Sequence, residues 1–258
     1  MTAFGRTWTL TRTSSSWIFS AQATTRPGRY GKSRNESVRW VKTLACSFLQ
    51  KNQKPKILCL GAHPDDIEVG SGGTILRLIQ EAPRADFRWV VFSGESARRE
   101  EARRGADAFL KEVKARKSDI CQFRDSYFPF MGAEIKDYFE KLKTEFAPDI
   151  IFTHYRGDAH QDHRLISELT WNAFRDHFIL EYEIPKYDGD FGTPNLYFHL
   201  PDNLVQQKMD HIFKTFETQK QKTWFTEETL RSVLRIRGME SNSPSKYAEA
   251  FYCRKIVF

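Results

Sequence analysis

The sequence predicts an α/β fold with a mostly parallel sheet flanked by helices. Apolar segments with the composition of buried strands begin at Lys56, and they alternate with amphipathic segments of ten or more residues. Parallel strands need a long crossover, usually a helix, so this alternation indicates repeated strand–helix–strand units. A chain of 258 residues can form one large domain of this kind or two small ones.

The first half of the alternation supplies four strands and three helices. Strands are expected at 56–62, 87–93, 120–123 and 149–154, and helices at 72–82, 96–113 and 132–147. Pro83 and Pro148 follow the first and third helices, where a residue that cannot continue a helix is expected. The third helix repeats apolar residues at the spacing of one helical face, namely Ile135, Phe139, Leu142 and Phe146. These elements predict a Rossmann-like, doubly wound sheet.

The second half continues with helices and shorter strands. Helices are expected at 165–175, 203–216 and 226–238, and strands at 178–185, 195–200 and 250–258. Thr226 is the expected N-cap of the last helix, because Glu227 and Glu228 follow it in the first turn, where acidic side chains are favourable.

Residues 1–53 differ in composition from the rest of the chain. They are rich in Ser, Thr and Arg and contain a single acidic residue, Glu36. This composition resembles that of an organellar presequence, although we favour a disordered extension or a start codon assigned too far upstream. Within it, residues 36–51 could form a short amphipathic helix. We therefore expect a basic extension at 1–53 and a folded domain at 54–258.

The net charge of +7 comes from the N-terminal part of the chain, counted here as residues 1–56. Residues 1–56 hold 11 of the 40 Lys and Arg residues, so the remainder carries 29 basic and 32 acidic side chains, a net charge of −3. Nucleic-acid binding therefore has little support, because the folded region lacks a basic surplus. The apolar runs are too short to span a bilayer, and four scattered cysteines suggest no disulfide framework. We expect a cytoplasmic protein with no transmembrane segment.

Two polar clusters follow two of the predicted strands. The first is His63, Asp65 and Asp66 after strand 56–62, and the second lies after strand 149–154 and comprises His154, Asp158, His160, Asp162 and His163. Ligands of open α/β sheets bind at the carboxyl ends of strands. If the two strands are neighbours, imidazoles and carboxylates meet in one crevice, and this donor set suits zinc.

Simpler interpretations exist for each motif. Helix capping would use one aspartate of the first cluster, but it leaves His63 and the other carboxylate without a role. The glycines of GSGG, residues 70–73, could approach a phosphate, but the spacing is not that of a dinucleotide-binding loop, and a tight strand-to-helix turn is favoured. A polar loop would account for HQDH alone, at 160–163. The two motifs together are far more specific than either one.

The pair of motifs resembles the LmbE or PIG-L family of zinc-dependent N-deacetylases. AHPDDIE at 62–68 is followed about a hundred residues later by THYRGDAHQDHR at 153–164, and the resemblance extends over residues 56–258. It implies an LmbE-like fold and a Zn²⁺ cofactor. It also implies removal of acetyl groups from N-acetylglucosamine units in glycosides, nucleotide sugars or polysaccharide precursors.

The resemblance also implies roles for individual residues. The zinc ligands are expected to be His63, Asp66 and His163. Asp65 is expected to be the general base on water, and His160 to assist the oxyanion or the leaving amine. Asp162 is expected to orient His160 and to raise its pKa.

One further residue is carried over, and one departs from the pattern. Arg98 is expected to contact the sugar, although it could equally be a solvated helix charge. Some members have a tyrosine that stabilises the oxyanion two residues before the first histidine of HxDH, where this chain has Asp158.

Several other polar or aromatic residues have a structural alternative. His154 ends its strand and is favoured as a structural or supporting residue, and His177, His199 and His211 are expected to be ordinary. The aromatic residues of FRDSYFPFMG, at 123–132, could belong to the core or line a sugar pocket. Tyr247 and Glu249 could reach the crevice or pack beside the C-terminal strand.

The sequence thus predicts a hydrolase of linear amide C–N bonds that removes the acetyl group of an N-acetylated amino sugar. Its partner would be a small molecule or glycan bearing an N-acetyl sugar, with no nucleic acid, and a homo-oligomer is compatible with the sequence. Two alternatives remain. One is an amidase for another N-acyl group or a thiol conjugate, and the other is a nucleotide-binding Rossmann module without hydrolase activity.

Overall fold

The structure is a computed structural model that describes residues 7–12, 17–22 and 54–256. Near the N-terminus, β1 (Thr7–Arg12) pairs antiparallel with β2 (Trp17–Gln22). The expected helix at 36–51 lies outside the described residues, as does most of the expected extension. The division of the chain at residue 53 therefore stays a prediction.

The described part of the main domain contains a seven-stranded sheet with the order β5-β4-β3-β6-β7-β9-β8. The five strands from β5 to β7 are parallel to one another, whereas β9 runs antiparallel to both of its neighbours. The strands are β3 (Lys56–Gly61), β4 (Asp86–Ser93), β5 (Ala115–Phe123), β6 (Ile150–His154), β7 (Phe178–Tyr182), β8 (Leu196–His199) and β9 (Ala248–Tyr252). The predicted α/β class with a mostly parallel sheet is confirmed.

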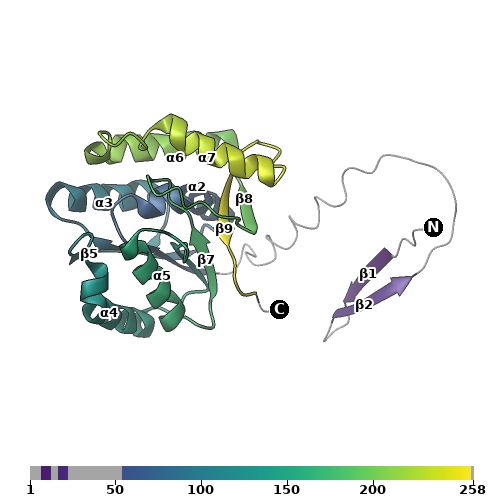
Figure 1. The fold of residues 1–258 in the computed structure, drawn as a ribbon. Helices are drawn as coiled ribbons and strands as arrows, with labels where there is room; N and C mark the ends of the chain where they lie inside the picture. The colour runs from purple at the N-terminus through teal and green to yellow at the C-terminus, as the bar shows by residue number, and fades with distance from the viewer. Residues whose placement is uncertain (1–6, 13–16, 23–53, 257–258) are drawn as a thin grey trace. The chain divides into compact units, whose positions relative to one another are not determined.

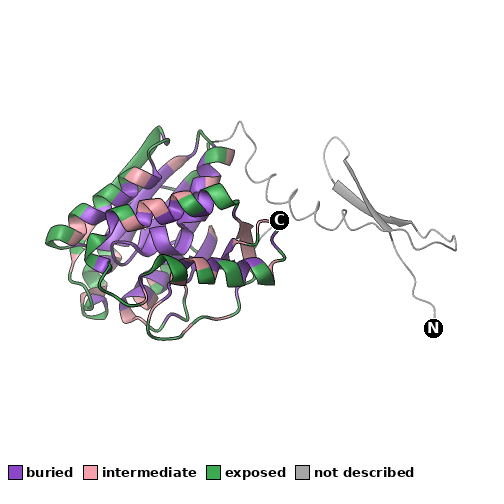
Figure 2. Cartoon of the chain, turned by 90° about the horizontal axis from the view of Figure 1, so that it is seen from above, coloured by how far each residue is buried: buried purple, intermediate pink, exposed green. Residues whose placement is uncertain are grey.

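Helices cover both faces of the sheet, and on one side they form two layers (Figure 1). The helices are α2 (Asp66–Glu81), α3 (Ser96–Phe109), α4 (Gly132–Glu145), α5 (Gln161–Ala173), α6 (Asp202–Thr215) and α7 (Glu227–Glu240). One face packs against α2 and α3, with α6 outside them and α7 beside α6 and against β9, and the other face packs against α4 and α5. The inner strands of the sheet are consequently buried, whereas the edge strands β5 and β8 are partly exposed (Figure 2).

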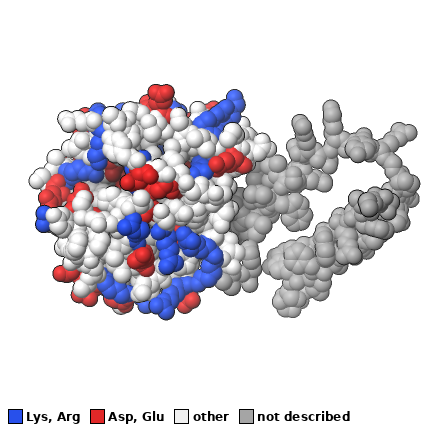
Figure 3. All heavy atoms as spheres, in the orientation of Figure 1, with Lys and Arg blue, Asp and Glu red and all other residues white. Residues whose placement is uncertain are grey.

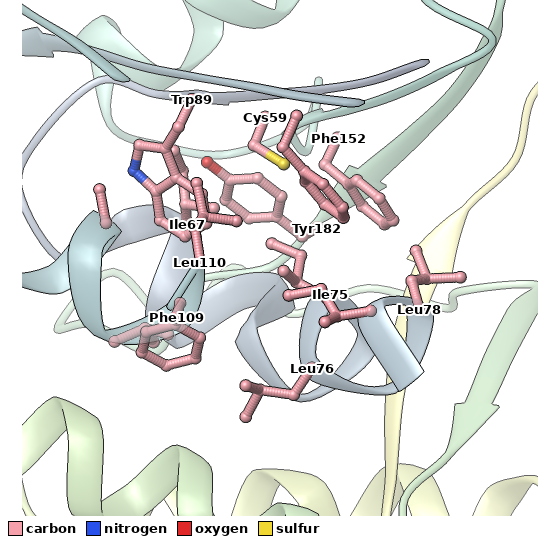
Figure 4. Close-up of a cluster of buried hydrophobic side chains, with 14 of the residues drawn as sticks. Cys59, Ile67, Ile75, Leu76, Leu78, Trp89, Phe109, Leu110, Phe152 and Tyr182 are labelled. Atoms are coloured by element: carbon pink, nitrogen blue, oxygen red, sulfur yellow. The ribbon is translucent and has the colours of Figure 1, made fainter. Parts of the chain in front are cut away.

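The core between the sheet and α2 is apolar and aromatic (Figure 4). Trp89, Phe152 and Tyr182 project from three strands toward Ile67 and Ile75 of α2, and all five side chains are fully buried. The Tyr182 hydroxyl donates a hydrogen bond to the Leu60 carbonyl at 2.6 Å, so its polar end is satisfied inside the core. This packing fixes α2 against the end of β3 from which the first polar motif emerges.

The strand order creates a switch point between β3 and β6. From β3 the chain adds β4 and then β5 on one side, whereas β6 and β7 are added on the other side. Successive crossovers therefore lead away from this pair in opposite directions, which leaves a crevice at the carboxyl ends of β3 and β6. The condition set by the sequence, that the two motif-bearing strands are neighbours, is met.

The glycine-rich segment differs from its prediction. Helix α2 already begins at Asp66, so GSGG lies inside the helix and not in a turn before it. A Cβ at Gly70 would lie 2.1 Å from the Tyr182 ring, one at Gly72 would lie 2.6 Å from Phe109, and one at Gly73 would lie 2.4 Å from Leu200. The glycines are thus required by close packing of α2, which a propensity argument cannot detect. The other element types agree with prediction, and the Thr226 side chain caps α7 by accepting a hydrogen bond from the Thr229 N–H at 3.1 Å.

Surface charge and helix hydropathy bear on whether the molecule has a membrane or nucleic-acid partner. The face shown in Figure 3 carries both basic and acidic side chains. Among the described residues, none of the helices has the length and apolar character needed to cross a membrane.

Candidate metal centre

The two polar motifs meet at the carboxyl ends of β3 and β6. His63, Asp65 and Asp66 follow β3 directly, and Asp66 is the first residue of α2. His154 is the last residue of β6, and the HQDH motif at 160–163 begins α5. The structure thus brings together all of the residues predicted for the metal site and its surroundings.

The three predicted ligands have donor atoms arranged as a compact triangle. His63 Nδ1 lies 3.1 Å from His163 Nε2 and 3.4 Å from Asp66 Oδ2, and the third side, between His163 and Asp66, is 3.6 Å. Zinc bonds of about 2.0–2.1 Å at tetrahedral angles imply ligand–ligand distances of about 3.3–3.4 Å. The residues present therefore fit a tetrahedral zinc ion with one position left open.

Each of the two histidines has a carboxylate at its other ring nitrogen. His63 Nε2 lies 3.2 Å from Asp162 Oδ2, and His163 Nδ1 lies 2.9 Å from Asp158 Oδ2. Carboxylates in this position fix the tautomer and ring orientation of metal-binding histidines. The arrangement leaves His63 Nδ1 and His163 Nε2, the two nitrogens of the triangle, free to accept a metal.

The charge states also suit a cation. Burial and the nearby His154 lower the pKa of His163 to about 4, so it is a neutral imidazole at pH 7. Burial favours protonation of Asp66, but the imidazoles of His163 and His154 outweigh it and hold the Asp66 pKa well below its ordinary value. Asp66 and His163 thus offer an ionised carboxylate and a neutral imidazole, the forms that bind zinc. For His63, burial is outweighed by the carboxylates of Asp125, Asp162 and Asp66, which raise its pKa well above the ordinary value, so this ligand must release a proton when a metal binds.

His154 serves the protein backbone. Its Nε2 accepts the Ala62 N–H at 2.9 Å and lies 3.2 Å from Asp66 Oδ2, and its ring stacks on His163 with 4.0 Å between centroids. His154 is also part of an alternative ligand set with Asp66 and His163, because one donor atom from each of the three residues lies within 4.8 Å of the other two. Since its Nε2 is already used by a backbone donor, the structural interpretation favoured by the sequence agrees with these contacts.

Asp65 has the properties of a general base. It is only 5% exposed, and among the described residues its Oδ2 has no hydrogen-bond partner. Burial, with a smaller contribution from the adjacent Asp66 charge, raises its pKa to about 7 against the opposing charge of Arg98. A carboxyl group with such a pKa can accept and release a proton near neutral pH.

His160 and Asp162 depart from their predicted relationship. His160 Nδ1 accepts the backbone N–H of Asp162 at 3.2 Å, whereas the Asp162 carboxylate accepts the N–H groups of Ser126 at 2.7 Å and Phe128 at 3.1 Å. Asp162 thus orients His63 and the loop after β5, and none of the hydrogen bonds of the described residues joins its carboxylate to His160. The sequence predicts a raised pKa for His160, and this prediction is wrong. Burial and the charge of His63 lower the His160 pKa more than the nearby carboxylates raise it.

Asp158 also differs from the tyrosine found in some family members. Its Oδ1 accepts the His160 N–H at 2.7 Å while its Oδ2 serves His163. Although burial opposes ionisation, the hydrogen bond from His163 and the positive charges around Asp158 hold its pKa well below the ordinary value. An ionised carboxylate has no proton to donate, so Asp158 cannot replace the tyrosine as an oxyanion donor.

Three further charged residues near the site, Lys186, Asp190 and Asp125, were not predicted from the sequence. Lys186 Nζ, on a side chain only 10% exposed, lies 3.0 Å from Asp158 Oδ2 and 2.5 Å from Asp190 Oδ2. Asp125 Oδ1 lies 3.3 Å from His63 Nε2 on a side chain that is 60% exposed. Both segments are loops without periodicity or a zinc-ligand spacing, so no local signal identifies these residues.

The remaining candidates have packing roles. Glu249 accepts the N–H groups of Gly73 at 2.8 Å and Thr74 at 2.6 Å, and it pairs with Lys208 Nζ at 2.6 Å. Tyr247 is partly buried against the main core. These contacts support the packing alternative for both residues.

Comparisons with known proteins identify the family of this chain. Residues 58–174 match the family model PIG-L, described as GlcNAc-PI de-N-acetylase. An uncharacterized deacetylase of Escherichia coli (strain K12), YaiS, is 30% identical over 146 residues, which cover 52% of this chain and 76% of that protein. The chain therefore belongs to the PIG-L family.

Two solved structures share the fold. The N,N'-diacetylchitobiose deacetylase from Pyrococcus horikoshii has a TM-score of 0.56 and 20% identity, over 86% of this chain and 94% of that one. The 4-carboxy-2-hydroxymuconate hydratase GalB from Pseudomonas putida KT2440 has a TM-score of 0.61 and 16% identity, over 79% and 98% of the two chains. Because a deacetylase and a hydratase share this architecture, the fold alone does not determine the reaction.

Proposed function

We propose that this chain is a zinc-dependent hydrolase that removes the acetyl group from an N-acetylated amino sugar. The observation that carries the proposal is the triangle of His63, Asp66 and His163 donor atoms beside a buried aspartate with a free carboxylate oxygen. His63, Asp66 and His163 would hold the zinc ion, which would lower the pKa of a coordinated water to about 7 and polarise the amide carbonyl. Membership of the PIG-L family supports the N-deacetylase chemistry.

Asp65 is proposed to move the proton. Its Oδ2 accepts a proton from the attacking water, and the raised pKa of Asp65 allows that carboxyl group to release the proton again to the departing nitrogen. Amide hydrolysis requires both transfers, since an amine must be protonated to leave.

His160 is proposed to stabilise the negative charge that develops on the carbonyl oxygen. Because its Nδ1 accepts the Asp162 N–H, the neutral imidazole carries its proton on Nε2. A donor held by the first turn of α5 needs little reorganisation during the reaction, which is the property of an effective oxyanion donor. Arg98, which the resemblance places on the sugar, lies beside Asp65 with 22% of its side chain exposed.

An N-acetyl amino sugar is favoured as substrate over the two alternatives. The family description and the name of the Pyrococcus relative both refer to N-acetylated sugars, which supports this class over another N-acyl compound. The nucleotide-binding alternative loses its main feature, because the glycines of GSGG are packed inside α2 and are not available to a phosphate.

The test is release of acetate from a panel of N-acetylglucosamine derivatives, comprising the free sugar, a glycoside, a nucleotide sugar and a short oligosaccharide. Zinc-loaded enzyme is expected to release acetate from at least one of them, and chelation should abolish this release. An N-acyl amino acid and a thiol conjugate serve as comparison substrates. Hydrolysis of these alone would overturn the sugar assignment, and equal activity after complete zinc removal would overturn the metal assignment.

A further inference from the structure

The loop that presents Asp65 is a tight turn with an unusual backbone. Asp65 has φ 95° and ψ −22°, and the Asp66 N–H donates to the His63 carbonyl at 3.4 Å. These values correspond to the third position of a type II turn across residues 63–66, with Pro64 at the second position. The third position requires positive φ and is normally occupied by glycine or asparagine, so an aspartate there is strained.

Type I and type II turns differ by rotation of the central peptide, here the one between Pro64 and Asp65. In a type I turn, residue 65 has a negative φ that an aspartate adopts without strain. Release of the Pro64 carbonyl would therefore allow the turn to relax toward type I. Such a rotation changes the direction in which the Asp65 side chain leaves the backbone.

Arg98 holds that carbonyl. Its Nη2 donates a hydrogen bond to the Pro64 carbonyl oxygen at 2.7 Å and lies 3.5 Å from Asp65 Oδ1. The same guanidinium thus fixes the orientation of the central peptide and occupies one oxygen of the carboxylate. The other oxygen, Oδ2, has no partner among the described residues.

Two residues hold Arg98 in turn. Its Nη1 lies 3.9 Å from Glu101 Oε2 and 3.5 Å from Thr218 Oγ1. Buried Glu101 accepts both the N–H of Thr218 at 2.8 Å and its hydroxyl at 2.6 Å. Thr218 belongs to the short 3₁₀ helix η2 (Glu217–Gln219) after α6, so the network joins α3 to the segment between α6 and α7.

We propose that Arg98 is a positioning residue that selects the type II turn at Pro64–Asp65, and that Glu101 and Thr218 hold it in place. The inference rests on the proposed function in one respect, namely that Asp65 is the base whose position matters. In this proposal Arg98 binds the protein's own backbone, whereas the family resemblance predicts that it contacts the sugar of the substrate. Glu101 and Thr218 thereby become determinants of the reaction rate without touching the substrate.

Steady-state kinetics separate the two roles of Arg98. For Arg98→Gln, Glu101→Gln and Thr218→Val, kcat is expected to fall by about 10- to 100-fold with KM within about twofold, because a small displacement of a catalytic group slows the chemical step. Arg98→Lys keeps a donor for the Pro64 carbonyl and is expected to recover part of the loss. A rise in KM for Arg98→Gln, with Glu101→Gln and Thr218→Val unchanged, would identify a sugar contact and overturn the proposal.

The matched control is Arg103→Gln. Arg103 lies on the same helix, with a side chain 54% exposed, and its nearest carboxylate, Glu100, is 3.9 Å away. It is expected to leave kcat and KM unchanged.

Hydrogen exchange provides a readout that needs no substrate. The amides of Asp66 and Val69 donate to the His63 and Asp65 carbonyls, so loosening of the turn should speed their exchange. Faster exchange over residues 62–70 in metal-free Arg98→Gln and Glu101→Gln, but not in Arg103→Gln, is the expected result. Unchanged exchange in both variants would refute the positioning role. Because the measurement needs no substrate, this result would leave the proposed function itself untouched.

Discussion

Replacing Asp65 by asparagine should make the metal-free protein more stable while removing most of its activity. Asparagine has nearly the same shape and tolerates positive φ well, so the turn can be kept. What changes is the titration. Burial raises the pKa of Asp65 from 3.8 to about 7, which means that the fold holds this proton more tightly than the unfolded chain does.

The sign and size of the effect follow from linkage. Below pH 3.8 both states are protonated, and Asp65 adds its full favourable contribution. Between pH 3.8 and about 7 only the unfolded chain releases the proton, so stability falls by about 1.4 kcal/mol per pH unit and by about 4 kcal/mol in total. Asparagine does not titrate, so the stability advantage of Asp65→Asn over the wild type should grow by about 3 kcal/mol between pH 5 and pH 8.

The assay is urea unfolding followed by tryptophan fluorescence, with a chelator present, at pH 5 and pH 8. Asp125→Asn is the control of opposite sign, because its hydrogen bond to His63 holds the Asp125 pKa well below the ordinary value and its loss should destabilise at neutral pH. A stability difference between wild type and Asp65→Asn that does not change with pH would refute the reasoning. A less stable Asp65→Asn at pH 8 would do so as well.

Three other predictions concern the surroundings of the site. His160→Gln should retain zinc but lose about 10²- to 10³-fold in kcat, because an oxyanion donor is removed; normal kcat would exclude that role. Lys186→Met should weaken zinc binding by about 10-fold in a competition titration, since Asp158 loses a partner that orients it toward His163; the surface variant Lys220→Met should not. Gly70→Ala should lower the unfolding free energy by about 1–3 kcal/mol, because its Cβ would overlap the Tyr182 ring, whereas Gly132→Ala has open space and should be neutral.

The residues proposed as ligands could be named from the sequence because they lie within two short motifs. Each motif directly follows a recognisable strand. The two motifs then meet if β3 and β6 are adjacent in the sheet, as they are. Their chemistry is also local, since His63, Asp66 and His163 are residue types that bind zinc wherever they converge.

The supporting residues could not be predicted, because their roles depend on contacts between distant segments. Lys186 reaches Asp158 from a loop 28 positions further along the chain, and a lysine in a loop is ordinarily solvated. The sequence places Asp162 beside its neighbour His160, whereas the fold turns the Asp162 carboxylate to His63 and to the backbone of 126–128. The helical position of Gly70 depends likewise on the Tyr182 ring, which comes from another strand.

The central claim is that His63, Asp66 and His163 hold one zinc ion while Asp65 does not. Metal analysis of purified wild type, Asp65→Asn, Asp66→Asn and His63→Ala after removal of loosely bound ions tests it most directly. About one zinc per chain is predicted for the wild type and for Asp65→Asn, and almost none for the other two. Loss of zinc from Asp65→Asn, or its full retention in Asp66→Asn and His63→Ala, would contradict the assignment of ligands and base.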